Sequence, residues 1–357
     1  MANRDNVYYW KCDRPDAFYA IGESAEDPKL QEMVKTMISG LFSEDPTVGS
    51  GGGQGNHKVF TVRIKDKSLF VRVENGRDSD NYMGIESEII KEAGYAGVPT
   101  PKIYYVDSSR KEWPFAYQVM ENVPFEDLNR LNRRGEVDLR IIMTALGRYI
   151  ALWQSLKYDG FGPFNAELYE SCQRLEGLHK AYKEYYYLNL NKHLEFLEIN
   201  DFLKKDQCLR IKNLIDENSS LLEIERGCLV HKDIALWNIL GTKNKITSII
   251  DWDDSICGDP TDDISLMGCY HTGEELECLM KGYESVKKLP DDFEKRFWLH
   301  LLRNMIFKAV IRVGGGYFNR GGDFFLSEDG AKLKETTLNR LNAAIEGLEG
   351  RRHPQEL

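Results

Sequence analysis

The stretch HKDIALWNIL, residues 231–240, places a histidine, an aspartate and an asparagine among isoleucine, leucine and tryptophan. An apolar run of this kind is expected to be buried. A buried carboxylate or amide is costly unless it is paired or binds an ion. We therefore expect Asp233 and Asn238 to have polar or ionic partners in the folded protein.

A second carboxylate-rich stretch follows in ITSIIDWDD, residues 246–254. The apolar runs before His231 and before Asp251 each read as a short strand that delivers a carboxylate near its end, and Asn238 lies between them. Mg²⁺ prefers a few protein oxygens together with phosphate and water. We therefore expect Asn238 and Asp251 to hold a magnesium ion that bridges nucleotide phosphates, which leaves Asp233 to accept the proton of an attacking hydroxyl.

A glycine-rich stretch, VGSGGGQGNHKVFTV at residues 48–62, suits close approach of backbone amides to a phosphate chain. A plain surface loop is the alternative interpretation. The stretch lacks the G-K-[ST] ending of a P-loop, and a strand rather than a helix follows it. A glycine-rich loop that leads into a β-hairpin is how protein-kinase-like folds cover ATP phosphates.

Such a loop requires a cation on the following strand, held by a carboxylate from a neighbouring helix. In SLFVRVEN the cation is Arg72, and the candidate carboxylates are Glu86 and Glu88. Each of these residues is also a common surface type. Their order along the chain favours the functional interpretation.

Two regions with different patterns of apolar and polar residues have to position these groups. The segments KVFTVRI and SLFVRVEN alternate apolar and polar residues and are joined by a short link at residues 65–67, which predicts a hairpin. A helix over residues 82–95 and two further short strands follow, and an amphipathic helix precedes them. From residue 125 the pattern is helical. We expect a sheet lobe over residues 1–123, including an N-terminal extension, and a helical lobe over residues 124–357 that carries the catalytic loop, the metal site and the acceptor site.

The composition excludes several classes of protein. The chain has 357 residues, enough for two lobes, with 42% hydrophobic and 29% charged residues, as in ordinary globular proteins. No apolar run approaches the roughly 20 residues of a spanning helix, and no signal peptide is visible, so we expect a cytoplasmic protein that does not bind membranes. The net charge of −10 argues against nucleic acid as a partner. The seven cysteines contain no C-x-x-C pair, so neither a disulfide framework nor a zinc site is indicated.

The joint pattern H-x-D-x-x-x-x-N, I-D-W-D and G-D-P-x-x-D, within residues 231–263, resembles the aminoglycoside phosphotransferase and choline kinase family. VPTP at residues 98–101, FAYQVMENV at 115–123 and the stretch 146–162 extend the resemblance over residues 47–266. The family is related to protein kinases and phosphorylates hydroxyl groups of small molecules. The resemblance implies an α+β, bilobal, protein-kinase-like fold with an antiparallel-sheet N-lobe and a mostly helical C-lobe.

The resemblance also implies roles for individual residues. Asp233 would be the catalytic base, Asn238 and Asp251 the magnesium ligands, and His231 a buried organiser of the catalytic loop. Glu86 would be the partner of Arg72, and adenine would bind main chain near Glu121 and Val123. Asp259 and Asp263 would be structural. The residues expected to fold over the nucleotide are Ser50, Gly51, Gly52, Gly53, Gln54 and Gly55.

Lys232 departs from the family pattern, which usually has glycine there. It would support the catalytic loop, and two environments are open for its ammonium: contact with the γ-phosphate, or extension into solvent. The N-terminal stretch 8–18 is also unusual for the family. We expect it to pack on the first lobe or to form a dimer contact.

The acceptor site is expected between the catalytic loop and helices of the second lobe. Phe161 and Tyr317 lie in segments that could face a ligand, whereas at least half of the tyrosines in residues 181–190 are expected in the core. Asp253 and Asp254 would attract an amino sugar, provide a further metal contact, or be plain surface charge.

The leading hypothesis is therefore a Mg²⁺-dependent kinase that uses ATP or GTP and a small hydroxylated acceptor, with sugars, amino sugars and aminoglycoside-like compounds first. A protein kinase, a nucleotide-binding pseudo-enzyme and a metal-dependent hydrolase built on the carboxylates of DWDD are the alternatives. The oligomeric state stays open.

Overall fold

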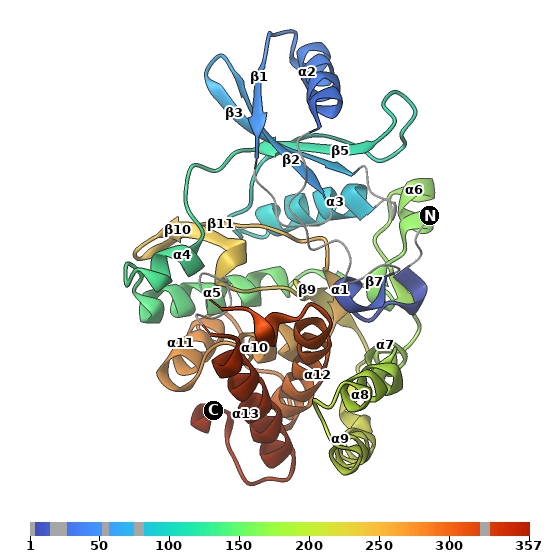
Figure 1. Cartoon of the computed structure of the whole chain (residues 1–357), viewed down its shortest axis with the longest axis vertical. Helices are drawn as coiled ribbons and strands as arrows, with labels where there is room; N and C mark the ends of the chain where they lie inside the picture. The colour runs from blue at the N-terminus through green and yellow to red at the C-terminus, as the bar shows by residue number, and fades with distance from the viewer. Residues whose placement is uncertain (1–3, 15–26, 52–56, 75–81, 322–328) are drawn as a thin grey trace.

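The structure is a computed structural model that describes residues 4–14, 27–51, 57–74, 82–321 and 329–357 (Figure 1). A sheet-containing lobe lies above a larger helical lobe in this view, and the chain passes between them after β5. The predicted α+β, two-lobed architecture is confirmed.

The first lobe is built on a five-stranded antiparallel sheet with strand order β1-β2-β3-β5-β4. The predicted hairpin is β2–β3, and its turn places Lys65 at a positive φ of 36°. The strands are β1 (Thr47–Ser50), β2 (Lys58–Ile64), β3 (Lys67–Glu74), β4 (Ile103–Asp107) and β5 (Ala116–Glu121).

Two helices accompany this sheet. Helix α2 (Pro28–Phe42) begins where the Asp27 side chain accepts a hydrogen bond from the Leu30 N–H, and its apolar face packs on inward residues of β2, β3 and β5. Helix α3 (Tyr82–Tyr95) has the predicted ends and lies between the sheet and the helical lobe in Figure 1. Its buried isoleucines join the core of the second lobe, so α3 couples the two lobes.

The second lobe is mostly helical, as predicted, and α12 runs through its core with both ends of the helix contributing buried residues. The tyrosine-rich stretch forms two helices rather than one, because Asn189 adopts a left-handed conformation with φ 56° between them. The helices are α4 (Leu128–Arg133), α5 (Leu139–Trp153), α6 (Ala166–Cys172), α7 (Tyr182–Tyr187), α8 (Leu190–Ile199), α9 (Lys205–Glu217), α10 (Thr261–Met267), α11 (Gly273–Glu284), α12 (Phe293–Gly314) and α13 (Gly330–Leu348).

Short strands of the second lobe flank the segments that contain Asp233, Asn238 and Asp251. One sheet has the order β6-β9-β12-β7-β8, and β10 pairs with β11 as a separate hairpin. The strands are β6 (Lys157–Tyr158), β7 (Phe161–Phe164), β8 (Gly177–His179), β9 (Gly227–Val230), β10 (Ile239–Thr242), β11 (Lys245–Ile249) and β12 (Ile256–Gly258).

The N-terminal segment differs from the prediction. Helix α1 (Trp10–Asp13) packs against α12, and Tyr8 and Tyr9 belong to the core of the helical lobe rather than the sheet lobe (Figure 1). Residues 15–18 of the same predicted segment lie outside the described residues. Within the part of the chain that the structure describes, no helix is both long and apolar enough to cross a membrane.

Candidate active site

The catalytic loop runs from the end of β9 to the 3-10 turn η3 (Leu236–Asn238). Asn238 donates from Nδ2 to the main-chain oxygen of Asp233 at 2.8 Å and lies 3.4 Å from its Oδ2. Both side chains are buried. The loop therefore brings together two of the three groups that the sequence singled out.

His231 ties this loop to the segment after β11. Its Nε2 donates to the Ile250 carbonyl at 3.0 Å, and its Nδ1 accepts from the Asp233 N–H at 3.3 Å. Burial holds the pKa of His231 down at about 4, so the ring is neutral at physiological pH. These contacts match the organising role implied for His231.

Asp251 lies next to Asn238, because the Ile250 N–H donates to the Asn238 carbonyl at 3.0 Å. Burial, and then the Asp253 charge, raise the pKa of Asp251 well above its ordinary range. Its backbone has a left-handed φ of 66°. The segment that carries Asp251 thus lies beside Asn238, and an amide oxygen together with a carboxylate is a donor set that fits a divalent cation.

Arg72 is buried on β3 and contacts Glu86 of α3 at 2.5 Å. Glu88, the other candidate, instead pairs with Lys91 at 3.3 Å near the surface. Burial by itself would lower the pKa of Arg72, but Glu86 and the nearby aspartates raise it above the ordinary value. The Nη2 of Arg72 also lies 4.0 Å from an Asp251 oxygen, so Arg72 links α3 to the segment that is expected to bind the metal.

His57 is a neighbour of Arg72 that sequence reasoning missed. It lies within the glycine-rich stretch, two residues after Gly55, and its Nδ1 accepts from Arg72 Nη2 at 2.9 Å. Burial and the Arg72 charge lower the pKa of His57 to about 3. The ring is therefore neutral.

Only part of the glycine-rich loop is described. Ser50 pairs with Phe60 through the backbone of β1, and the Gly51 N–H donates to the Val59 carbonyl at 2.9 Å. A Cβ at Gly51 would lie 2.4 Å from the Val59 side chain, so this position requires glycine. Gly52, Gly53, Gln54 and Gly55 lie outside the described residues.

The segment after β5 connects the lobes and contains the predicted adenine contacts. Glu121 ends β5, opposite Leu69 of β3. The Val123 carbonyl accepts from the Phe125 N–H at 2.9 Å, whereas the N–H of Val123 has no hydrogen-bond partner among the described residues. That N–H is available to a purine edge. A hollow of about 600 Å³ lies beside this segment, but its lining includes none of Asp233, Asn238 and Asp251.

Lys232 occupies neither of its two expected environments. Its side chain is 1% exposed, and its ammonium pairs with Asp262 at 2.7 Å and hydrogen-bonds the Tyr8 hydroxyl at 3.0 Å. The Lys232 N–H donates to Asp263 at 3.1 Å. Lys232 thus supports the catalytic loop from the protein interior, and its buried ammonium does not face a space where a phosphate could bind.

Asp263 and Asp259 make the structural contacts expected of them. Asp263 accepts from the His231 N–H at 3.0 Å and from Trp153 Nε1 at 2.9 Å. Burial raises the pKa of Asp263 to about 6. Asp259 accepts from the Thr261 N–H at 2.8 Å and pairs with Arg296 at 2.7 Å.

The residues predicted to contact the acceptor lie in different environments in the structure. Phe161 is buried in β7 against Tyr182, so it belongs to the core and is not an acceptor contact. Three of the tyrosines, Tyr182, Tyr185 and Tyr186, are fully buried, as expected. Tyr317 lies within electrostatic range of Lys11 and Arg312, near the catalytic loop.

Asp253 and Asp254 are not surface charges. Asp253 lies 3.9 Å from Arg72, and burial raises the pKa of Asp254 to about 7, with Asp253 as the next cause.

Lys11 of α1 is the functional neighbour that the sequence did not reveal. Its ammonium contacts Asp233 Oδ2 at 2.9 Å, and Lys308 of α12 lies 4.0 Å from Oδ1. Burial would raise the pKa of Asp233, but Lys11 and Lys308 outweigh it and lower the pKa. Asp233 is thus held ionised. A signal for Lys308 did exist, since polar residues recur every four positions along α12, in a part of the helix that is mostly apolar: His300, Asn304, Lys308 and Arg312.

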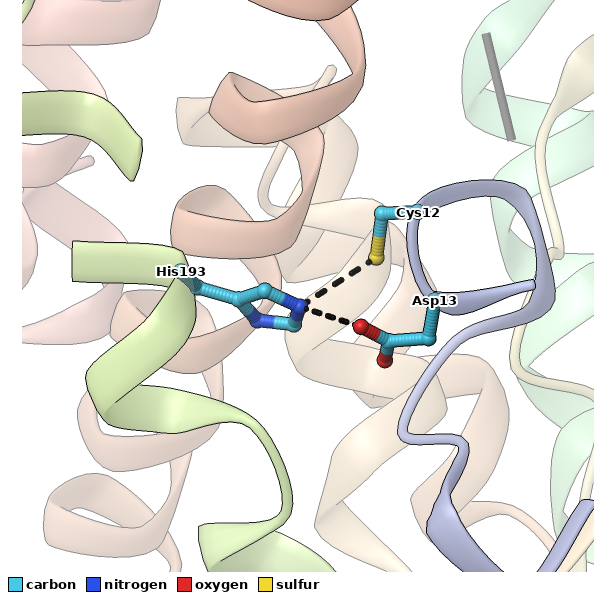
Figure 2. Close-up of side chains that lie close together, drawn as sticks. All are labelled: Cys12, Asp13 and His193. Carbon is cyan, nitrogen blue, oxygen red and sulfur yellow. Dashed lines mark hydrogen bonds and ion pairs between the residues drawn. The ribbon is translucent and has the colours of Figure 1, made fainter. Parts of the chain in front are cut away.

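Figure 2 shows how the N-terminal segment is anchored. Asp13 accepts from His193 Nε2 at 2.8 Å and from the Tyr8 N–H at 2.9 Å, and Cys12 Sγ lies 3.6 Å from the same Nε2. Arg303 points a guanidinium N–H at His193 Nδ1 at 3.0 Å. Because guanidinium only donates, Nδ1 accepts and Nε2 carries the proton, so no ring nitrogen is left for a metal. The cluster is an anchor for α1, although its three residue types could ligate an ion.

Comparison with known structures shows that the fold of this chain is shared by other proteins. A thermostable mutant of the aminoglycoside phosphotransferase APH(4)-Ia, in a ternary complex with ADP and hygromycin B, aligns over 88% of this chain and 98% of its own, with 14% identity and a TM-score of 0.62. A proposed fructosamine-3-kinase from Haemophilus somnus 129PT aligns over 88% and 100%, with 10% identity and a TM-score of 0.58. A proposed aminoglycoside phosphotransferase from Ralstonia eutropha JMP134 aligns over 89% and 98%, with 13% identity and a TM-score of 0.60. At these identities the similarity shows the shared fold.

The sequence comparisons show to which family the chain belongs. No curated protein sequence matches the chain. A profile of the phosphotransferase enzyme family (APH) matches residues 49–286, which include the glycine-rich stretch, Arg72 and the whole catalytic loop. The predicted resemblance is confirmed: the chain belongs to the phosphotransferase enzyme family, whose fold and order of motifs it shares.

Proposed function

We propose that this phosphotransferase moves the γ-phosphoryl group of ATP or GTP to a hydroxyl group of a small molecule, with Asp233 as the base. The observation that carries the proposal is the convergence of Asp233, Asn238 and Asp251 within one loop and the segment bonded to it. Phosphoryl transfer asks a protein mainly for positioning and charge neutralisation. Asp233, ionised and buried, accepts the proton of the attacking hydroxyl.

Asn238 and Asp251 would hold Mg²⁺, which supplies charge neutralisation for the nucleotide phosphates when bound. Arg72, oriented by Glu86, adds a fixed positive charge on the side of the first lobe. Ser50 to Gly55 would cover the phosphates, and the main chain at Glu121 and Val123 would bind the base. The complex of a structural relative with ADP is in keeping with a nucleotide at this place.

The acceptor is a small hydroxylated molecule, and sugars are the first class to test. The names of the structural relatives refer to aminoglycosides and fructosamine, which are sugar derivatives. The aromatic side chains of Trp237 and Tyr270, whose ring centroids are 4.9 Å apart, offer flat faces near the loop that would suit a sugar ring.

The test is nucleotide consumption with a panel of aminoglycosides, other sugars, choline-like alcohols and nucleosides. For an acceptor found in this way, Asp233→Asn should lower kcat by about 10²–10⁴-fold with little change in nucleotide affinity, because the base acts only in the transfer step. Asp251→Ala should instead weaken Mg²⁺–nucleotide binding. Asp66→Asn, in the exposed turn between β2 and β3, is the matched control and should behave like the wild type. Full turnover by Asp233→Asn would refute the assignment of the base.

A further inference from the structure

Lys308 is a buried cation whose positive charge is only partly balanced by its neighbours. The residue is 6% exposed, its ammonium makes no hydrogen bond to any described residue, and its closest carboxylate oxygen is Asp233 Oδ1 at 4.0 Å. The ammonium lies 4.9 Å from the ring centroids of Tyr270 and Phe307. Contacts with aromatic faces offset only part of the cost of burying such a charge.

Asp233 is not a sufficient counter-charge for Lys308, because Lys11 already occupies it. Lys11 Nζ contacts Asp233 Oδ2 at 2.9 Å, so one carboxylate faces two ammonium groups. A single lysine would be enough to keep the base ionised.

Arg312 adds a third cation one helical turn beyond Lys308. It is 4% exposed, and its Nη1 donates to the Thr337 hydroxyl at 2.8 Å. Among the described residues it has no ion pair with a carboxylate. A buried guanidinium with only a neutral acceptor is costly unless a ligand supplies the negative charge.

The three cations are close enough to act on one another. Burial is the main cause that lowers the pKa of Lys308, to about 8, and Arg312 and Lys11 contribute as like charges against the attraction of Asp233. The carboxylate that acts most strongly on Lys308 is Asp233. Asp254, Asp251 and Asp253 raise the pKa of Lys11 instead, and the last two also face Arg72.

We propose that the acceptor of this enzyme carries an anionic group, a carboxylate or a phosphate, and that Lys308 and Arg312 bind it while its hydroxyl faces Asp233. The proposal rests on the phosphotransferase function proposed above and narrows its acceptor class. Lys308 and Arg312 lie on one face of α12, at a spacing of four residues, and so can share the oxygens of one anion. A polycationic aminoglycoside would bring like charge to the same place.

The experiment compares four molecules on one ring scaffold at constant ionic strength: glucose, glucosamine, glucuronate and glucose 6-phosphate. Binding to the full-length enzyme, loaded with Mg²⁺ and a non-hydrolysable ATP analogue, is measured by calorimetry, and ADP release is measured with ATP. We expect one of the two anionic members to bind at least tenfold more tightly than glucose, and glucosamine to bind most weakly. The glucuronate and glucose 6-phosphate arms distinguish a carboxylate acceptor from a phosphorylated one.

Single-residue variants test whether Lys308 and Arg312 bind the anionic group. Lys308→Met and Arg312→Met should each reduce the preference for the anionic member about tenfold, whereas Lys281→Met, which removes an exposed lysine on α11, should leave it unchanged. Equal binding of the four molecules, tightest binding of glucosamine, no binding of either anion, or an unchanged preference in Lys308→Met would each overturn the proposal.

Asp233→Asn separates this inference from the function on which it rests. If that variant keeps the anion preference in calorimetry but loses ADP release, both ideas stand. If it keeps ADP release, the assigned base is wrong, although the anion site is unaffected.

Discussion

Lys232 adopts a left-handed backbone conformation, with φ at 68°, directly before the catalytic aspartate position. Glycine adopts this conformation without strain, whereas a residue with a Cβ pays about 1 kcal/mol or more. The ion pair of the Lys232 ammonium with Asp262, and its hydrogen bonds to Tyr8 and Asn304, offset this cost. Tyr8 of the N-terminal segment thus helps to hold Lys232 in this conformation.

Lys308 leads to a prediction about stability and pH. Its pKa of about 8 in the folded protein lies below the ordinary value of 10.5. Between these values the unfolded chain binds more protons than the folded protein, so the Lys308 contribution to stability rises with pH through this window, and at neutral pH the charge is destabilising. We expect Lys308→Met to raise the free energy of unfolding at pH 7, by up to about 3 kcal/mol.

Urea denaturation of both proteins at pH 7 and pH 9.5 measures this difference. The advantage of the variant should shrink at the higher pH, because the wild-type lysine is then largely neutral in the folded state. A wild type that is more stable than Lys308→Met at pH 7 would contradict the assignment of Lys308 as a destabilising cation.

At the scale of elements, α5 and α11 pack closely through glycines. A Cβ on Gly147 of α5 would lie 1.9 Å from the Leu279 carbonyl oxygen, and one on Gly282 of α11 would lie 2.0 Å from the Thr144 carbonyl oxygen. Helix α5 also carries Trp153, which donates to Asp263 beneath the catalytic loop at 2.9 Å. The close approach of these helices thus helps to place the loop.

We expect Gly147→Ala to destabilise the protein by about 1–3 kcal/mol, because the added methyl group overlaps backbone that has no room to move. Gly40→Ala on α2 is the control, since a Cβ there meets nothing within 4 Å. It should stabilise the protein by about 0.5–1 kcal/mol through helix propensity. Thermal unfolding of the two variants tests the pair, and equal effects would show that the interhelical contact is looser than described.

At the scale of the whole molecule, the N-terminal segment lies against the candidate active site, although the two are far apart in the sequence. Tyr8 contacts Lys232 and accepts a hydrogen bond at its carbonyl from Tyr185, while Lys11 contacts Asp233. These contacts join residues more than 170 positions apart in the chain. Residues 8–11 are therefore part of the helical lobe and lie against Asp233.

Asp13 is the residue that fastens this segment, so Asp13→Ala should release it. The variant loses the hydrogen bonds to the Tyr8 and Tyr9 N–H groups and to His193, and leaves the buried His193 without its acceptor. We expect rapid chymotrypsin cleavage at Tyr8, Tyr9 or Trp10, mapped by mass spectrometry. Lys11→Met, which removes the ammonium but keeps the anchor, should stay as protected as the wild type, and equal protection of Asp13→Ala would refute the anchoring role.

The sequence by itself determined the elements and groups whose causes are local. Period-two alternation specified the β2–β3 hairpin, and apolar spacing specified α3 with its observed ends. The spacing of Asp233, Asn238 and Asp251 was enough to predict that they converge, because only 18 residues separate the first from the last and a short hairpin joins them.

Only the tertiary structure decided the surroundings of these groups. It buried Lys232 on Asp262, placed Phe161 in the core, and brought Lys11 and Lys308 to Asp233 from opposite ends of the chain. Each of these outcomes depends on which surfaces pack together after the helices form. Local periodicity carries no information about a contact between residues 11 and 233, so the charge around Asp233 was set by packing and not by pattern.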